Sequence, residues 1–229
     1  MPTPLVLFDI DGTLMRSQGV GVSAMQMAFD ALYPDRGLRM QGVPVAGRLD
    51  TLIWADVLRN GGLDPAAEDQ GRFRERYKAF LRERLASAVV RRMPGVLELV
   101  ERLHQGGAST VGLLTGNWED TGLLKIATAG FTTSHFRLGA FAGDGPDRRS
   151  LPPVAMRRCA ELTGQAPRPE RTIIIGDTPL DVDCAHHNGC RVIAVATGDF
   201  TMDQLRPTGA DLVLETLDDV DMVERWLLA

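Results

Sequence analysis

The segment Leu5-Val6-Leu7-Phe8-Asp9-Ile10-Asp11-Gly12-Thr13 decides the fold, because it joins a short apolar run to a pair of carboxylates. A short apolar run bounded by polar residues is typical of a strand buried on both faces of a parallel sheet. In an open α/β sheet, ligands bind beyond the carboxyl ends of the strands. Two aspartates there would repel each other unless a cation or a shared proton offset their charge. The segment therefore predicts an α/β fold with a polar site at the end of its first strand.

Further apolar runs repeat this pattern along the chain. They cover Thr110–Leu114, Thr172–Ile175, Arg191–Ala196 and, more weakly, Leu212–Leu214. Helical patterns fall between them, over Gly95–Leu103, Glu119–Ala129, Pro153–Leu162 and Pro179–His187. Strands that alternate with helices indicate a doubly wound, Rossmann-like parallel sheet.

The long stretch between the first and second strands has a different character. It carries no convincing strand pattern, and helical periodicity recurs in it over Val22–Leu32, Thr51–Leu58 and Gly71–Ala86. We therefore predict two domains. Residues 1–15 and 91–229 would form the Rossmann-like core, and residues 16–90 would form an inserted, all-helical cap domain.

Composition excludes several classes of protein. The chain has 229 residues, of which 44% are hydrophobic and 24% charged, as in an ordinary soluble globular protein. Its net charge of −5 argues against a nucleic-acid partner, which would need a basic face. The three cysteines match no metal-binding spacing. Because the apolar runs are too short to span a membrane and no basic leader precedes the first strand, we expect a cytoplasmic protein without membrane contact.

A second acidic cluster follows the run Thr172–Ile175. It reads Gly176-Asp177-Thr178-Pro179-Leu180-Asp181, so that Asp177 stands at the strand end as Asp9 does. Carboxylates gathered at strand ends predict a site for a hard cation, and Mg²⁺ fits because it binds through one or two carboxylates and keeps waters and substrate phosphate. Asp181 has two competing interpretations, a functional one and a structural one, since Thr178 and Asp181 also form a capping-box pattern.

A third polar segment, Thr115-Gly116-Asn117, follows the run Thr110–Leu114. Its hydroxyl and free backbone N–H groups could hold phosphoryl oxygens. On its own this signal is weak, because many strands lead into turns of this composition.

The three segments, in this order and each after a hydrophobic strand, resemble the haloacid dehalogenase superfamily, specifically its phosphoglycolate-phosphatase-like branch. The resemblance covers essentially the whole chain, and the insert lies where that branch carries its helical C1-type cap. The aspartate at position 11 favours phosphoryl chemistry over dehalogenation, since carbon–halogen cleavage needs no proton for the leaving group. The resemblance thus implies an Mg²⁺-dependent phosphatase.

The resemblance also implies a role for each matching residue. Asp9 would attack phosphorus and form an aspartyl-phosphate, and Asp11 would act as general acid and base. Asp9, Asp177 and Asp11, the last through its backbone carbonyl, would hold the Mg²⁺. Asp181 would stand behind them and orient a water or the cationic partner. The segment Thr115-Gly116-Asn117 would bind the phosphoryl group.

The sequence departs from the family at one position. The family has a lysine shortly before the last acidic motif, whereas the only lysines here are Lys78 and Lys125. Aligning the stretch before Pro152 and Pro153 with the family's Lys-Pro-x-Pro pattern puts Arg149 in the lysine's place as a third catalytic residue. Arg148 is the near alternative and Lys125 a further one.

The sequence leaves the substrate and the oligomeric state open. In the insert, Arg48 matches a cap segment of the family and would reach the distal part of a small phosphorylated metabolite, although a place on the surface fits as well. Two alternatives to a phosphatase stay open. One is a phosphomutase like β-phosphoglucomutase, and the other is a regulatory or binding protein with a weak site.

Overall fold

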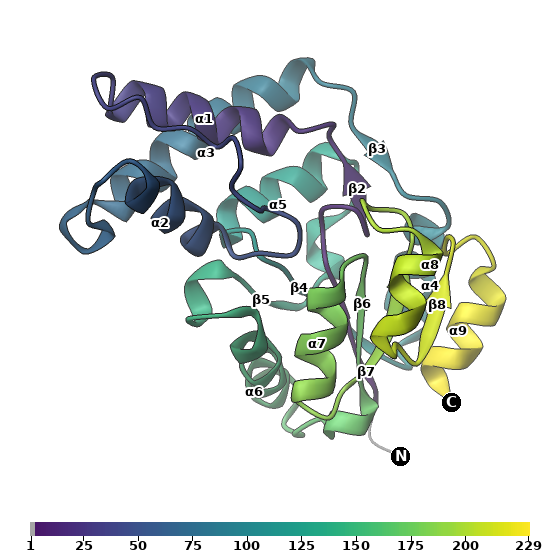
Figure 1. Cartoon of the computed structure of the whole chain (residues 1–229). Coiled ribbons are helices and arrows are strands. Elements are labelled where there is room, and N and C mark those ends of the chain that lie inside the picture. The colour runs from purple at the N-terminus through teal and green to yellow at the C-terminus, as the bar shows by residue number, and fades with distance from the viewer. Residues whose placement is uncertain (1–2) are drawn as a thin grey trace.

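A parallel sheet of six strands forms the centre of the protein (Figure 1), seen in a computed structural model that describes residues 3–229. The strand order is β5-β4-β1-β6-β7-β8, with bounds Leu138–Ala140, Thr110–Leu114, Leu5–Phe8, Thr172–Gly176, Arg191–Val195 and Leu212–Leu214. β1 is parallel to both β4 and β6, with Phe8 in register with Leu113 and with Ile175. The residues that follow these three strands must therefore meet at one edge of the sheet.

Two helical layers cover the sheet, and the alternation of side chains along β1 shows why. Leu5 and Leu7 pack with residues of α6 (Leu151–Thr163) and α7 (Pro179–His187). Val6 and Phe8 pack on the other face with residues of α4 (Val96–Gly106) and α9 (Val220–Leu228). All four residues of β1 are fully buried, as expected for the central strand of a doubly wound sheet.

The insert leaves and rejoins the sheet through a short antiparallel ribbon. Its strands, β2 (Met15–Arg16) and β3 (Arg91–Arg92), pair with Met15 opposite Arg92. Three helices lie between them and gather on one side of the sheet edge (Figure 1): α1 (Val20–Leu32), α2 (Asp50–Asn60) and α3 (Gln70–Ser87).

An aromatic cluster holds these helices together and attaches them to the core. Phe73 of α3 lies at its centre, with its ring centroid 4.4 Å from that of Phe29 and 6.3 Å from that of Trp54. Trp118, which comes from the core, lies 6.2 Å from Phe73 and 5.9 Å from Tyr77. The helical insert therefore has an apolar centre that continues into the core domain.

The predicted α/β fold with an inserted helical cap is confirmed, and the strand predictions agree to within one residue. The helices also lie where the periodicity indicated, with α5 observed at Glu119–Thr128. Several elements were missed, among them the short ribbon strands β2 and β3. β5 has only three residues, Leu-Gly-Ala, which give no periodic signal, and α9 lies at the end of the chain beyond the last predicted strand. The short helix α8 (Met202–Leu205) was not predicted either. No helix within residues 3–229 has the length and apolar character needed to cross a membrane.

Candidate active site

Acidic side chains from two neighbouring strands converge at the sheet edge. Asp9 follows β1 and Asp177 follows β6, and with Asp181 they form a buried group in which one carboxylate oxygen of each lies within 4.8 Å of the others. The Asp9 carboxylate is fixed from its own backbone, because its Oδ1 accepts the Ile10 N–H at 2.7 Å. Asp9 and Asp177, which the sequence predicts to share a site, therefore also lie close together in the structure.

Two glycines make room for Asp177. Gly12 has a φ of +87°, a conformation that glycine adopts without strain, and a Cβ there would collide with the Asp177 carboxylate. A Cβ at Gly198 would collide with the same carboxylate. The Thr13 hydroxyl donates to Asp177 Oδ1 at 3.3 Å. The glycine of the first motif is therefore required by the close approach of a second carboxylate.

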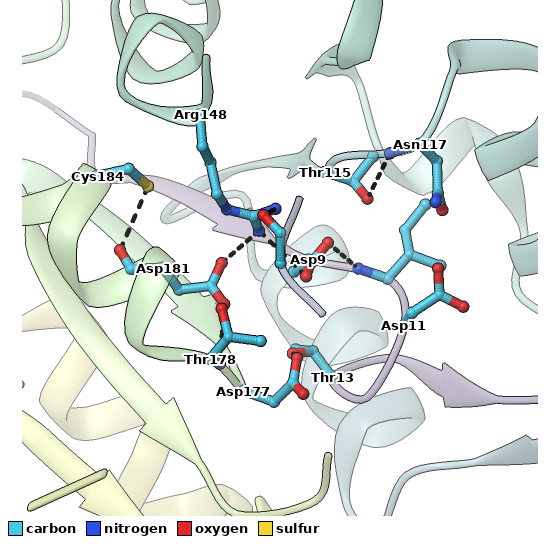
Figure 2. Close-up of polar contacts among 12 residues, drawn as sticks. Asp9, Asp11, Thr13, Thr115, Asn117, Arg148, Asp177, Thr178, Asp181 and Cys184 are labelled. Carbon is cyan, nitrogen blue, oxygen red and sulfur yellow. Dashed lines mark hydrogen bonds and ion pairs between the residues drawn. The ribbon is translucent and has the colours of Figure 1, made fainter. Parts of the chain in front are cut away.

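The cation beside Asp9 is Arg148, not Arg149, which corrects the sequence-based choice. Arg148 Nη2 lies 3.1 Å from Asp9 Oδ2 and also pairs with Asp181, and its side chain is 6% exposed (Figure 2). The Arg149 side chain is 50% exposed and pairs with Asp183 at 2.6 Å.

The cause of this misassignment is local. Arg148–Ser150 forms a single 3₁₀ turn before α6, capped by Asp147, whose Oδ1 accepts the Ser150 N–H at 2.9 Å. Adjacent residues of such a tight turn point in different directions. Counting positions back from the proline pair therefore identified the wrong arginine.

Asp181 fills both of the roles that the sequence left open. Its Oδ2 accepts the Thr178 hydroxyl at 2.7 Å and the Thr178 N–H at 3.0 Å, which caps α7. Its Oδ1 accepts from Arg148. Because both oxygens are engaged in this way, Asp181 lies behind the Asp9–Asp177 pair and holds the arginine in place.

Asp11 points to a different partner, Lys125. Lys125 Nζ lies 2.5 Å from Asp11 Oδ2 and 3.3 Å from Asn117 Oδ1. The Lys125 side chain is only 4% exposed, whereas that of Asp11 is 46% exposed. The Asp11 side chain thus does not join the acidic group of Asp9 and Asp177.

Lys125 was named only as a remote substitute for the family lysine, although a signal for its position existed. In a helix that begins at Glu119, the buried face contains Thr121, Gly122 and Ile126. Position 125 shares this face, because residues three and four apart are neighbours on a helix. A lysine on the inner face of the helix that follows Thr115-Gly116-Asn117 has to point toward the site.

The third segment lies at the same edge, as the sequence predicted. Thr115 is buried and its N–H donates to Ala140 O at 3.0 Å, so that β5 fixes this turn. The Asn117 N–H donates to Thr115 Oγ1 at 3.4 Å. Thr115, Gly116 and Asn117 line the same cavity as Asp9.

The insert closes this cavity with a segment that we call the cap loop, residues 45–50. The Asp50 N–H donates to Gly116 O at 2.6 Å, and Asp50 Oδ2 accepts the Trp118 N–H at 3.0 Å. Arg48 lines the cavity, although its guanidinium pairs with Asp56 at 2.6 Å. The cavity measures about 210 Å³, a size that suits a small metabolite. Asp50 belongs to the cap segment that resembles the family, but only Arg48 was given a role there from the sequence.

Burial raises the pKa values of the clustered carboxyl groups. Desolvation is the largest cause at both strand ends, raising the pKa of Asp9 to about 6 and that of Asp177 to about 9. The positive charge of Arg148 partly lowers the pKa of Asp9 again. The negative charges of Asp181 and Asp9 raise the pKa of Asp177 further. Burial likewise raises the pKa of Asp50 to about 7. The single positive charge of Arg148 therefore does not compensate the negative charges that Asp9, Asp177 and Asp181 would carry when ionised.

The residues present fit a hard divalent cation. Asp9 and Asp177 each offer a carboxylate oxygen, and these oxygens lie within 4.8 Å of each other. Burial and the neighbouring carboxylates raise the pKa of Asp177, and a bound cation would offset both effects. Mg²⁺ prefers such oxygen donors. The acidic group can therefore hold a metal ion.

Comparison with known proteins gives the same picture. A HAD-hydrolase-like family model matches residues 148–220. A phosphoglycolate phosphatase of Mesorhizobium japonicum is 27% identical over 100% of this chain and 99% of its own length, and the pyrophosphatase PpaX of Anoxybacillus flavithermus is 24% identical over 94% of both. The structure of CbbY from Rhodobacter sphaeroides with phosphate superposes with a TM-score of 0.73 at 19% identity, covering 96% of each chain.

The architecture is that of a doubly wound α/β protein with acidic side chains at its strand ends and a helical insert beside them. The chain is similar to haloacid dehalogenase-like hydrolases, and phosphoglycolate phosphatases are among the relatives that align with it over nearly its whole length.

Proposed function

We propose that the protein is an Mg²⁺-dependent phosphatase of a small phosphorylated metabolite, a phosphomonoester of phosphoglycolate-like size. The observation that carries the proposal is Asp9, a buried residue that lies beside Arg148 and Asp177 and lines a small cavity. Three of the relatives that align over nearly the whole chain are phosphoglycolate phosphatases, which supports hydrolysis of a phosphoric monoester as the reaction.

In the first step, Asp9 Oδ2 would attack phosphorus while the bond from phosphorus to the leaving oxygen breaks. The Ile10 N–H bond to Oδ1 leaves the other oxygen to act as nucleophile. Asp11 would give its proton to the leaving oxygen and later take one from the water that attacks the aspartyl-phosphate. Its partly exposed side chain lines the cavity, which suits a group that exchanges protons.

The phosphoryl group itself would be held by Thr115, Gly116 and Asn117. Arg148 would offset the negative charge that accumulates on Asp9 and on the phosphoryl oxygens, since a guanidinium binds both in fixed geometry. Asp9, Asp177 and the backbone carbonyl of Asp11 would hold Mg²⁺, which supplies further charge neutralisation when bound.

The domain division belongs to the same proposal. Residues 16–90 would act as the cap domain and residues 1–15 and 91–229 as the core, with Arg48 contacting the part of the substrate that leaves. A cytoplasmic location stays a prediction from composition.

Substitution of the nucleophile tests the proposal. We expect Mg²⁺-dependent release of phosphate from p-nitrophenyl phosphate or from a panel of small phosphomonoesters. Asp9→Asn should lower this activity more than about 10³-fold, since no aspartyl-phosphate can form. Asp183→Asn, an exposed aspartate paired with Arg149, is the control and should keep full activity.

Other outcomes would point to the alternative functions. Conversion of a sugar 1-phosphate without release of phosphate would indicate a phosphomutase. Tight binding of phosphorylated metabolites without turnover of any of them would indicate a binding protein.

A further inference from the structure

One guanidinium contacts both halves of the site. Arg148 Nη2 reaches Asp9 and Asp181 on the core side (Figure 2). Its other terminal nitrogen, Nη1, donates to the carbonyl oxygen of Gly47 in the cap loop at 3.0 Å. Its Nε has no hydrogen-bond partner. The side chain is therefore held entirely through the two ends of its fork, one in the core and one in the insert.

The cap loop fits tightly where Arg148 holds it. Gly47 has a φ of +69°, and a Cβ there would lie 2.5 Å from Thr178 Oγ1, the hydroxyl that also donates to Asp181. A Cβ at Gly116 would collide with the Arg48 carbonyl. The loop thus approaches the strand-end segments as closely as two glycines allow, and a small displacement would break its contacts.

An arginine is suited to this double contact and a lysine is not. The guanidinium is planar and presents its donors in a rigid fork, so that the two terminal nitrogens move together. An ammonium group is a compact point charge on a flexible stem. A lysine at this position could offset the charge of Asp9, but it would not also reach Gly47 in a fixed geometry.

We propose that Arg148 is a positioning residue that fastens the cap loop to the nucleophile, so that closure of the cap and neutralisation of Asp9 are coupled. The proposal rests on the proposed function for its kinetic consequences only. With the loop fastened, the leaving group is enclosed beside Asp9. With the guanidinium withdrawn, the loop loses one of its bonds to the core, and its remaining bonds through Asp50 break more often.

Amide hydrogen exchange at Asp50 tests the coupling, because its N–H donates to Gly116 O only while the loop is docked. We expect Arg148→Lys to speed this exchange about 10-fold, the effect of losing one hydrogen bond to a charged group. Arg149→Lys is the matched control, the same change one residue away on an exposed ion pair, and it should leave the Asp50 exchange unchanged.

Gly47→Ala disturbs the hydrogen bond between Arg148 and the Gly47 carbonyl from the side of the cap loop. It provides a second test if Arg148→Lys folds poorly. It should speed the Asp50 exchange to a similar extent, and the double variant should exchange no faster than either single one. Unchanged exchange in both single variants, or fully additive effects, would overturn the proposal.

A kinetic readout separates coupling from charge neutralisation alone. Because the lysine keeps a cation near Asp9, Arg148→Lys should raise KM at least about fivefold and lower kcat by less. A loss confined to kcat, with KM intact, would mean that Arg148 acts only as a charge. The exchange measurement needs no turnover, so an inactive protein with coupled exchange would refute the proposed function and leave this proposal standing.

Discussion

At the scale of single residues, the site contains a buried lysine surrounded by carboxylates. Lys125 bonds Asp11 and Asn117, and the Asp11 and Asp50 carboxylates together raise its pKa despite the opposing effect of burial. A buried cation with partners is tolerated, but removing it leaves the partners uncompensated. Lys125 therefore holds the proposed general acid in place and also allows Asp50 to be buried.

Replacing this lysine should affect both stability and activity. We expect Lys125→Met to lower the free energy of unfolding by about 1–3 kcal/mol, since Asp50 is left in an apolar site without a cation. Activity should fall because Asp11 loses the contact that orients it. Urea denaturation and initial-rate measurements check the two effects.

Lys78→Met provides the comparison for this prediction. Lys78 pairs with Asp120 at 3.1 Å with both side chains partly exposed, so its loss should cost at most about 1 kcal/mol. Equal effects of the two substitutions would show that the Lys125 cluster is dispensable.

At the scale of elements, helix α3 connects the insert to the core. Phe73 is fully buried and its ring contacts aromatic rings of α1, of α2 and of the core residue Trp118. Because several elements share this one side chain, its truncation would loosen all of them. We expect Phe73→Ala to lower the free energy of unfolding by about 3–5 kcal/mol.

Phe80 on the same helix is the matched control. It is only partly buried and lies beneath the Arg76 guanidinium, 5.3 Å from it. Phe80→Ala should therefore cost roughly 1 kcal/mol. A denaturation curve that shifts equally for both variants would contradict the central place given to Phe73.

The elements also show where sequence reasoning succeeded and where it failed. Buried strands such as β1 and β6 are continuous apolar runs followed by acidic residues, a signal that survives without any tertiary information. β5 is too short to have a period, and it forms because the edge of β4 offers hydrogen bonds. Its existence depends on the neighbouring strand, which the local sequence does not record.

The same distinction applies to the site. Asp9, Asp177 and Thr115 were predictable because strand ends of a parallel sheet must meet. The choice between Arg148 and Arg149 depended on the direction of one 3₁₀ turn, and Asp50 depended on how the cap loop docks. Both are tertiary facts that residue spacing cannot supply.

At the scale of the whole molecule, stability should depend jointly on pH and on Mg²⁺. The pKa values of Asp9, Asp50 and Asp177 rise to about 6, 7 and 9 in the folded protein from an ordinary value of 3.8. Folding therefore favours their protonated forms. Their contribution to stability is fully present below pH 3.8 and is lost as the pH rises through these raised values.

We expect the melting temperature of the metal-free protein to fall between pH 5 and pH 9, by on the order of 5 °C. Mg²⁺ should restore it, and more strongly at the higher pH, because the ion competes with protons for the carboxyl groups of Asp9 and Asp177. Asp177 has the largest pKa shift of the three carboxyl groups. Asp177→Asn should therefore weaken the dependence of the melting temperature on pH and on Mg²⁺. Calorimetry with and without a chelator measures them, and a Mg²⁺ effect that is unchanged by pH would contradict the linkage.

The paired strands β2 and β3 have a consequence for how such proteins diversify. Since entry to and exit from the insert lie side by side, about 5 Å apart as in any antiparallel pair, a single excision at this ribbon would leave ends that a short turn can join. The helical insert can thus be exchanged as a unit, and a different insert could be joined at β2 and β3 without changing the strand order of the sheet.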